Sequence, residues 1–212
     1  MICVCIRETN LEDCFRALEN ESLAELRLDL MGLPPAQTRQ LFSLPLKLIA
    51  TCRPGPYSAG ERMRLLKGAV EAGASYVDIE VEAVGDFKRE IVDCCRERGC
   101  KIIVSYHNYK LTPPLSELRH IVNTCFDSGG HIAKIACTVK TGTECSRLLA
   151  LYDDPRDLIA LAMGEAGKIS RIAAPLLGAP FTYAALSGGR QTADGQIDRD
   201  TLRRILTDIA HA

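Results

Sequence analysis

The sequence predicts a single (β/α)8 barrel, the TIM barrel, for this chain of 212 residues. Short apolar runs alternate with amphipathic stretches along the whole chain, which is typical of repeated βα units. No linker rich in proline, glycine or serine divides the chain, and 47% of its residues are hydrophobic, enough for one sizeable core. We therefore expect one domain that spans residues 1–212.

Eight runs have the length and pattern of strands. They are residues 2–6, 24–30, 46–51, 76–81, 101–105, 132–137, 158–162 and 180–183. The segments between them show helical spacing, as in Leu115, Leu118, Val122 and Cys125. Strict alternation implies a parallel sheet, and eight units favour a closed barrel. A doubly wound open sheet is the alternative, but no glycine-rich phosphate-binding motif follows an early strand.

Charge and hydropathy exclude two classes of partner. The formal net charge is −1 and the sequence pI is about 6.4, so there is neither a basic stripe for nucleic acid nor a polybasic anchor for a membrane. The first residues, MICVCIRETN, lack the apolar stretch of a signal peptide, and no segment approaches the length of a membrane span. We expect a cytoplasmic protein.

Ten cysteines raise the question of disulfides or a metal site. Most of them lie inside apolar patterns such as ICVCI, VDCC and KIACT, which indicates reduced, buried side chains. No paired CxxC or Cys/His spacing is present. The sequence therefore predicts no metal site.

The run HIAKIACT places Lys134 in the middle of an apolar strand. Side chains alternate along a strand, so a strand covered on both faces buries the lysine. Burial penalises the ammonium form and lowers the pKa, and a partly neutral lysine can attack a carbonyl carbon to form an imine. Alternatively, the side chain reaches solvent from the strand end.

Polar residues at inward positions near the carboxyl ends of barrel strands build active sites. In AELRLDL the charged residues Glu25, Arg27 and Asp29 alternate with leucines and share one face, and they need polar partners under a layer of helices. Arg53 follows the strand LKLIAT, and YVDIEV carries two acidic residues on one face. These charges are candidates for binding a polar ligand.

His107 follows the apolar run KIIVS by two residues, where we expect the strand to give way to its loop. It lies one βα unit before Lys134, a position that suits a general acid/base beside a nucleophile. Farther along, MGEAGKISRI contributes Arg171, and the loop SGGRQTADGQI contributes Thr192 and Gln196. Their guanidinium, hydroxyl and amide groups could bind a carboxylate and cover it as a lid.

In chain order, ELRLDL, TCRP, YVDIE, VSYHN, KIACT, MGEAGKISRI, PFTYAAL and TADGQ resemble the motifs of the type I 3-dehydroquinate dehydratases. The resemblance extends from the second strand to near the C-terminus. It implies a (β/α)8 barrel, usually a homodimer, that converts 3-dehydroquinate to 3-dehydroshikimate in the shikimate pathway through an imine, without metal or cofactor.

The resemblance also assigns roles to residues. Lys134 in KIACT is similar to the imine-forming lysine, and His107 in SYHN to the histidine that transfers protons. Glu25, Arg27 and Arg53 resemble contacts that orient the substrate and bind its hydroxyl groups. The remaining matches resemble the carboxylate-binding and lid residues; they are Arg171, Thr192 and Gln196.

Two segments depart from the family pattern. Many members continue the arginine strand into a glutamate and two glycines, whereas TCRPGPYSAGE is shortened and Glu61 is not at the matching distance. The carboxylate that orients the histidine is thus expected to be missing, with Asp78 a candidate to replace it in part. The lid segment TADGQ carries Asp194, whose charge either weakens binding of an anionic substrate or points outward.

Two other functions stay open. Another class I lysine-imine barrel enzyme, such as an aldolase, would share Lys134 and the fold, but no glycine-rich phosphate site is evident in the last two loops. A barrel that binds the ligand without efficient chemistry would explain the missing glutamate, but it needs neither Lys134 nor His107.

Overall fold

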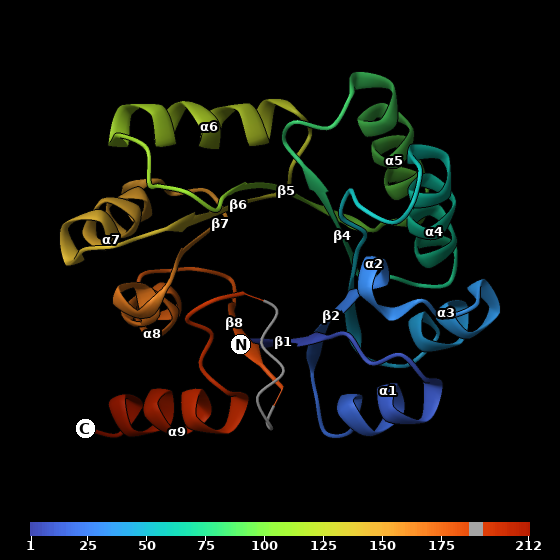
Figure 1. Cartoon of the computed structure of the whole chain (residues 1–212), viewed down its shortest axis with the longest axis horizontal. Helices are drawn as coiled ribbons and strands as arrows, with labels where there is room; N and C mark the ends of the chain where they lie inside the picture. Colours follow the sequence, from blue (N-terminus) through green and yellow to red (C-terminus); the bar gives the residue numbers. More distant parts are fainter. Residues whose placement is uncertain (187–192) are drawn as a thin grey trace.

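Eight strands form the inner wall of the molecule and helices surround them (Figure 1). The structure is a computed structural model that describes residues 1–186 and 193–212. Within these residues the strands are β1 (Ile2–Ile6), β2 (Leu23–Arg27), β3 (Lys47–Thr51), β4 (Tyr76–Glu80), β5 (Lys101–Asn108), β6 (Ile132–Thr138), β7 (Leu158–Met163) and β8 (Thr182–Ala185).

The helices of the described residues lie outside this wall. They are α1 (Leu11–Leu18), α2 (Leu28–Met31), α3 (Pro35–Phe42), α4 (Ala59–Glu71), α5 (Gly85–Arg98), α6 (Leu115–Asp127), α7 (Gly142–Leu149), α8 (Lys168–Leu176) and α9 (Arg199–Ala210), with short 3-10 turns η1 (Ala150–Asp153) and η2 (Glu165–Gly167). Local signals fix several starts: capping boxes of Ser58 with Glu61 and Thr141 with Glu144 begin α4 and α7.

Each strand pairs in parallel with its neighbours in the order β7-β6-β5-β4-β3-β2-β1-β8. In the described part of the chain no ladder joins β7 to β8, so the barrel is nearly closed rather than fully closed. The alternation of strands and helices confirms the predicted single-domain (β/α)8 barrel.

Strand side chains form two separate apolar cores. One lies between the sheet and the helices and includes Val4, Leu26 and Ile135. The other fills the barrel interior and includes Ile103 and Phe181. Because strand residues alternate between these cores, the sequence position decides which side chains face the barrel axis.

In three strands the observed bounds differ from the expected ones by two residues or more. Strand β2 stops at Arg27, and Asp29 lies in α2 rather than on the strand, where its carboxylate accepts two hydrogen bonds from Arg27. This local side-chain pairing competes with continuation of the strand. Strand β5 continues through His107 to Asn108, and β8 spans Thr182–Ala185 instead of 180–183.

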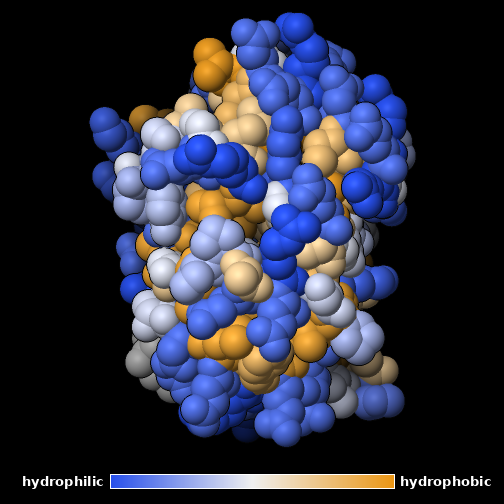
Figure 2. Space-filling model, turned by 90° about the vertical axis from the view of Figure 1, so that its right-hand side faces the viewer, coloured by the Kyte–Doolittle hydropathy of each residue, from blue (hydrophilic) through white to orange (hydrophobic). Residues whose placement is uncertain are grey.

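The outer face formed by α3, α4 and α5 is mainly hydrophilic, with apolar residues between the helices (Figure 2). A cleft of about 380 Å³ lies between α3 and α4, lined by Leu33, Tyr57 and Leu65 together with Arg39 and Arg64. The residues that line this cleft include none of the polar residues that face the barrel interior. Among the described helices, none has the length and apolar character needed to cross a membrane.

Candidate active site

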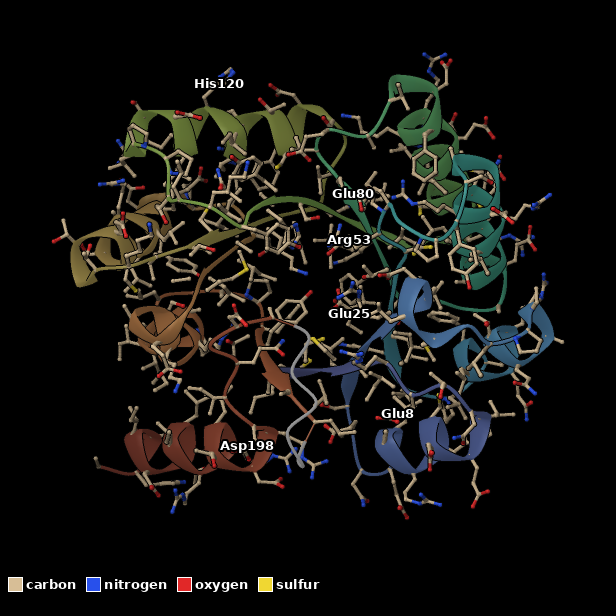
Figure 3. The ribbon with its side chains drawn as sticks, in the orientation of Figure 1. Glu8, Glu25, Arg53, Glu80, His120 and Asp198 are labelled. Atoms are coloured by element: carbon tan, nitrogen blue, oxygen red, sulfur yellow. The ribbon has the colours of Figure 1, made fainter. Side chains whose placement is uncertain are left out.

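The polar residues of five neighbouring strands meet inside the barrel near the carboxyl ends of the strands. Glu25, Asp78, Ser105 and Lys134 all occupy inward positions, and the strand register places Ser105 beside Lys134. In Figure 3 the side chains of Glu25, Arg53 and Glu80 extend into the barrel, whereas His120 on α6 extends away from it.

Lys134 is buried, with only 6% of its surface exposed. Its Nζ lies 3.0 Å from Oδ2 of Asp78, 3.4 Å from Oε1 of Glu25 and 4.1 Å from the centroid of the Tyr183 ring. Burial by itself lowers the pKa of Lys134, but the two carboxylates outweigh it and leave the pKa above its ordinary value. The expected lowering of this pKa is therefore wrong for the ligand-free site.

The two carboxylates are held by further hydrogen bonds. Thr51 donates to Glu25 at 2.8 Å, and the Cys5 thiol donates to its other oxygen at 3.3 Å. Ser105 donates to Asp78 at 2.6 Å. Burial raises the pKa of both carboxyl groups, but nearby cations lower it more, chiefly Lys134 for Glu25 and Arg53 for Asp78, so both are ionised at neutral pH.

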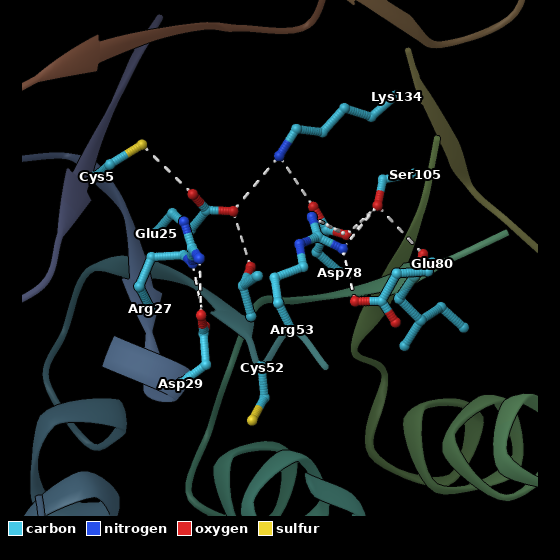
Figure 4. A network of polar contacts seen from close by, with 12 residues as sticks. Cys5, Glu25, Arg27, Asp29, Cys52, Arg53, Asp78, Glu80, Ser105 and Lys134 are labelled. Atoms are coloured by element: carbon cyan, nitrogen blue, oxygen red, sulfur yellow. Dashed lines mark hydrogen bonds and ion pairs between the residues drawn. The ribbon is translucent and has the colours of Figure 1, made fainter. Parts of the chain in front are cut away.

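Arg53 joins this cluster to a third acidic residue, Glu80 (Figure 4). Its guanidinium lies 2.9 Å from Asp78 and 3.0 Å from Glu80, and it donates to Ser105 at 2.9 Å. Despite burial, the facing carboxylates Asp78 and Glu80 raise the pKa of Arg53. The other oxygen of Glu80 lies 2.7 Å from Arg62 of α4, so Glu80 is shared by two arginines.

His107 lies on β5, two residues closer to the barrel mouth than Ser105. Its ring stacks on Tyr109 with 6.1 Å between centroids. Burial, together with the charges of Arg53 and Lys134, holds the pKa of His107 well below its usual range, so the imidazole is neutral at pH 7.

No side chain of the described residues makes a hydrogen bond to His107. Asp78 acts on it through charge alone, because its oxygens bond Lys134, Arg53 and Ser105 instead. Glu61 caps helix α4 by bonding Ser58. Neither Asp78 nor Glu61 therefore supplies a carboxylate that bonds and orients His107. This carboxylate was expected to be missing.

Residues from the last two βα units approach the same site. Arg171 on α8 is buried and donates from Nε to the backbone oxygen of Gly195 at 3.0 Å, and burial lowers its pKa to about 10. Gln196 is buried and its amide donates to the sulfur of Cys5 at 3.5 Å. Thr192 lies outside the described residues.

Residues 193–196, the described part of the predicted lid, contact the end of β7 through their backbone. The amide of Gly164 donates to the backbone oxygen of Asp194 at 3.2 Å, while the Asp194 side chain is exposed. Gly195 has φ of +75°, and a Cβ there would lie 2.4 Å from the backbone oxygen of Gly164. Only glycine fits at position 195, so close to the backbone oxygen of Gly164. The Asp194 side chain is exposed, so its charge points outward.

One cavity of about 60 Å³ collects most of the predicted residues. It is lined by Glu25, Arg27, Arg53, His107, Lys134, Arg171 and Gln196. Sequence reasoning missed Cys5 and Tyr183, which also line it, and the bonding partner Ser105. Strand alternation could have found all three, because each shares the inward face of its strand with other interior residues.

The fold and this cavity define a (β/α)8-barrel enzyme, because buried, convergent ionisable groups at the carboxyl ends of the strands mark the active site of such barrels.

Comparison with known proteins identifies the family. The family model described as "Type I 3-dehydroquinase" matches residues 2–212 of this chain. The 3-dehydroquinate dehydratase of Desulfotalea psychrophila is 32% identical over 217 residues, which cover 96% of each chain. The crystal structure of the 3-dehydroquinate dehydratase from Aquifex aeolicus is 27% identical with a TM-score of 0.84 and full coverage of both chains.

A third protein supports the fold alone. The type I 3-dehydroquinate dehydratase from Clostridium difficile has a TM-score of 0.87 at 22% identity, over 99% of this chain and 92% of that one. The chain belongs to the type I 3-dehydroquinase family. The predicted family, and with it the prediction of an enzyme, is confirmed.

Proposed function

We propose that this protein dehydrates 3-dehydroquinate to 3-dehydroshikimate in the shikimate pathway, through an imine on Lys134. The observation that carries the proposal is a lysine buried inside the barrel, with a neutral histidine closer to the mouth on the next strand. Family membership supplies the substrate class. It also favours the dehydratase over the aldolase alternative.

Six other residues bind the substrate in this proposal. Arg171 and Gln196 hold the carboxylate, since a guanidinium and an amide both donate to it and both line the cavity. We assign Thr192 to binding of the same carboxylate. Glu25, Arg27 and Arg53 hold the hydroxyl groups and orient the ring; the Arg27–Asp29 and Arg53–Asp78 ion pairs keep the two guanidinium groups in place.

Lys134 must lose a proton before it can attack. In the resting site Glu25 and Asp78 stabilise its ammonium form. Substrate hydroxyl groups that donate to Glu25 compete with Lys134 for this carboxylate and weaken the stabilisation. The neutral amine then forms a bond to the C3 carbonyl carbon. The carbonyl oxygen takes up one proton from the amine and the proton that the ammonium released, and leaves as water, so that the nitrogen keeps one N–H group in a cationic iminium.

His107 carries out the two later proton transfers. The iminium withdraws electrons and acidifies the C2 hydrogen, which neutral His107 removes to give an enamine. The enamine electrons then form a double bond between C2 and C1. The C1 hydroxyl group accepts the proton from His107 and leaves as water. Hydrolysis of the iminium releases 3-dehydroshikimate and regenerates Lys134. One imidazole thus acts as base and then as acid.

The test is to mix the protein with 3-dehydroquinate, add borohydride, and measure intact and peptide masses. We expect a reduced adduct on the peptide that contains Lys134. Lys134→Met should form no adduct and lose turnover. Lys140→Met is the matched control, because Lys140 is exposed just after β6, and it should behave as wild type.

Two outcomes would count against the proposal. A folded, reduced wild-type protein that remains unmodified excludes the imine mechanism. Adduct formation without release of 3-dehydroshikimate would instead favour the alternative of a barrel that binds the ligand and has lost efficient chemistry.

We also propose a homodimer. The supporting observation is the outer face of α8, which presents apolar side chains at helical spacing; they are Ile169, Ile172, Ala173 and Leu176, followed by Leu177. Leu176 is 56% exposed. A continuous exposed apolar stripe of this kind is typical of a protein interface.

The cytoplasm is the proposed location. All ten cysteines lie in the described residues and carry free thiols, and nine of them are buried. Unpaired, buried thiols are typical of proteins in a reducing compartment. Fractionation of cells that produce the protein would test this location, and recovery outside the cytoplasm would contradict it.

A further inference from the structure

An aromatic ring also lies next to the Lys134 ammonium. Two sides face the carboxylates of Asp78 and Glu25, at 3.0 and 3.4 Å. The ring of Tyr183 lies 4.1 Å from Nζ, measured to the ring centroid. This separation is well within the range of cation–π attraction, and only 3% of Tyr183 is exposed, so water does not screen the contact.

The hydroxyl group of Tyr183 does not account for its position. It is the one buried side-chain oxygen without a hydrogen-bond partner among the described residues. A buried hydroxyl in that state costs free energy. The ring itself is fixed by packing, because it lies on the inward face of β8 and contacts Phe181, with 5.6 Å between centroids. The aromatic face is therefore the part of Tyr183 that serves the site.

Charged groups from three other strands of the barrel act on Lys134. Those that favour the ammonium are Glu25 on β2 and Asp78 on β4, and Arg53 after β3 opposes it. His107 on β5 is neutral, so it adds no charge. The ring acts on Nζ in addition to these groups.

We propose that the ring of Tyr183 stabilises the positive charge on the Lys134 nitrogen, first in the ammonium and then in the iminium. The iminium half of this inference rests on the proposed function. An ammonium has three N–H groups, whereas an iminium has one, so both carboxylates cannot keep their hydrogen bonds after condensation. Attraction to a ring face needs no N–H group and persists through the step.

The test weakens the ring's negative face without changing its size. Tyr183→Phe removes only the unpaired hydroxyl, and phenylalanines carrying one, two and three fluorines at position 183 then reduce the attraction stepwise. The first readout is the rate at which cyanate carbamylates Lys134 at fixed pH, followed by peptide mass. Cyanate reacts with the neutral amine, and Lys140 in the same digest gives an internal reference.

We expect the carbamylation rate of Lys134, relative to Lys140, to rise roughly threefold from the unfluorinated to the most fluorinated ring. The second readout is borohydride trapping with 3-dehydroquinate as a function of pH. Loss of the attraction should lower the alkaline pH at which trapping halves. The same fluorines placed at Phe181 should change neither readout, because the Tyr183 ring is the one that contacts Nζ.

An unchanged Lys134 rate across the series, or an equal change from fluorines at Phe181, would overturn the inference. The proposed function fails separately, if the wild-type protein forms no adduct with 3-dehydroquinate. In that case the carbamylation series still measures the effect of the ring on the ammonium.

Discussion

At the scale of single residues, position along each strand predicted most of the site. Strand alternation put Glu25 on one face with Arg27 and predicted a buried Lys134 for a strand covered on both faces, and the structure shows Glu25 and Lys134 3.4 Å apart although 109 residues separate them in the chain. Strand ends and loops also made Arg53, Arg171 and Gln196 candidates, and resemblance to a family gave them roles. Because a strand residue has only two possible faces, one apolar pattern per strand is enough to decide which residues face inward.

The charge state of Lys134 could not be predicted in the same way. The apolar run left open whether Lys134 is buried or reaches solvent, and the structure shows it buried. The sign of its pKa shift depends on partners from other strands. Asp78 is 56 residues away in sequence, and its distance from Nζ is fixed by strand register and side-chain conformation. The residues next to Lys134 in the sequence therefore do not predict the distance between Asp78 and Nζ.

His107→Ala should remove turnover while leaving imine formation intact. We expect kcat to fall roughly 10²- to 10⁴-fold, the usual contribution of a positioned general acid/base, with borohydride still yielding the Lys134 adduct. His120→Ala is the matched control, because His120 is exposed on α6 and extends away from the barrel (Figure 3). Equal kcat in His107→Ala and wild type would contradict the role.

The pH profile gives a second check on His107. Its pKa is lowered in the folded protein, so protonation requires a more acidic solution than for a free imidazole. A base in the free enzyme must be neutral, and kcat/KM should therefore keep its full value down to pH 6.5 and decline only below it. A decline centred above that pH would exclude His107 as the base.

At the scale of elements, the segment after β3 departs most from the family pattern. The shortened loop leads into α4, whose first turns supply Arg62. Arg62 is buried, donates from Nε to the backbone oxygen of Cys52 at 2.8 Å, and pairs with Glu80, which in turn pairs with Arg53. Through Glu80, Arg62 of helix α4 thus holds Arg53, which follows β3, in place from outside the barrel.

Arg62→Met should reduce kcat/KM about tenfold, a loss of about 1.4 kcal/mol of transition-state stabilisation, because Glu80 loses one of its two partners and Arg53 loses a fixed anchor. Arg62→Lys should retain part of the activity. If Arg62 acts through Arg53, its replacement in an Arg53→Met background should add nothing further.

The matched control is Arg64→Met, since Arg64 is exposed on the same helix two residues later. Additive losses in the double variant would show that Arg62 affects activity independently of Arg53. A drop in thermal stability without a change in kcat/KM would show that the ion pair serves folding alone.

At the scale of the whole molecule, the alternation of apolar and amphipathic segments was sufficient for the barrel. It predicted a closed barrel, whereas no ladder joins β7 to β8 in the described residues, because closure depends on strand tilt and stagger rather than on composition. Nor did it identify the outer face of α8, where Leu176 and the following Leu177 lie exposed at the end of a helix that was noted only for Arg171.

Leu176→Glu should convert the proposed dimer to a monomer, because it places a charge within the apolar stripe on α8. Sedimentation equilibrium at micromolar concentration measures the mass. Val84→Glu is the control: Val84 is 74% exposed and precedes α5, away from this stripe. A monomeric wild type, or a Leu176→Glu variant that stays dimeric, would contradict the proposed interface.

In the described residues no backbone ladder joins β7 to β8, and the two βα units are linked instead by single hydrogen bonds such as Arg171 to Gly195 and Gly164 to Asp194. Along the described residues every other pair of neighbouring strands is held by backbone rungs. Arg171 follows β7 and Gln196 follows β8, so the two groups assigned to the substrate carboxylate stand on opposite flanks of this gap. A carboxylate held by both would tie the flanks together, so that the substrate itself would complete the ring mechanically while it is being converted.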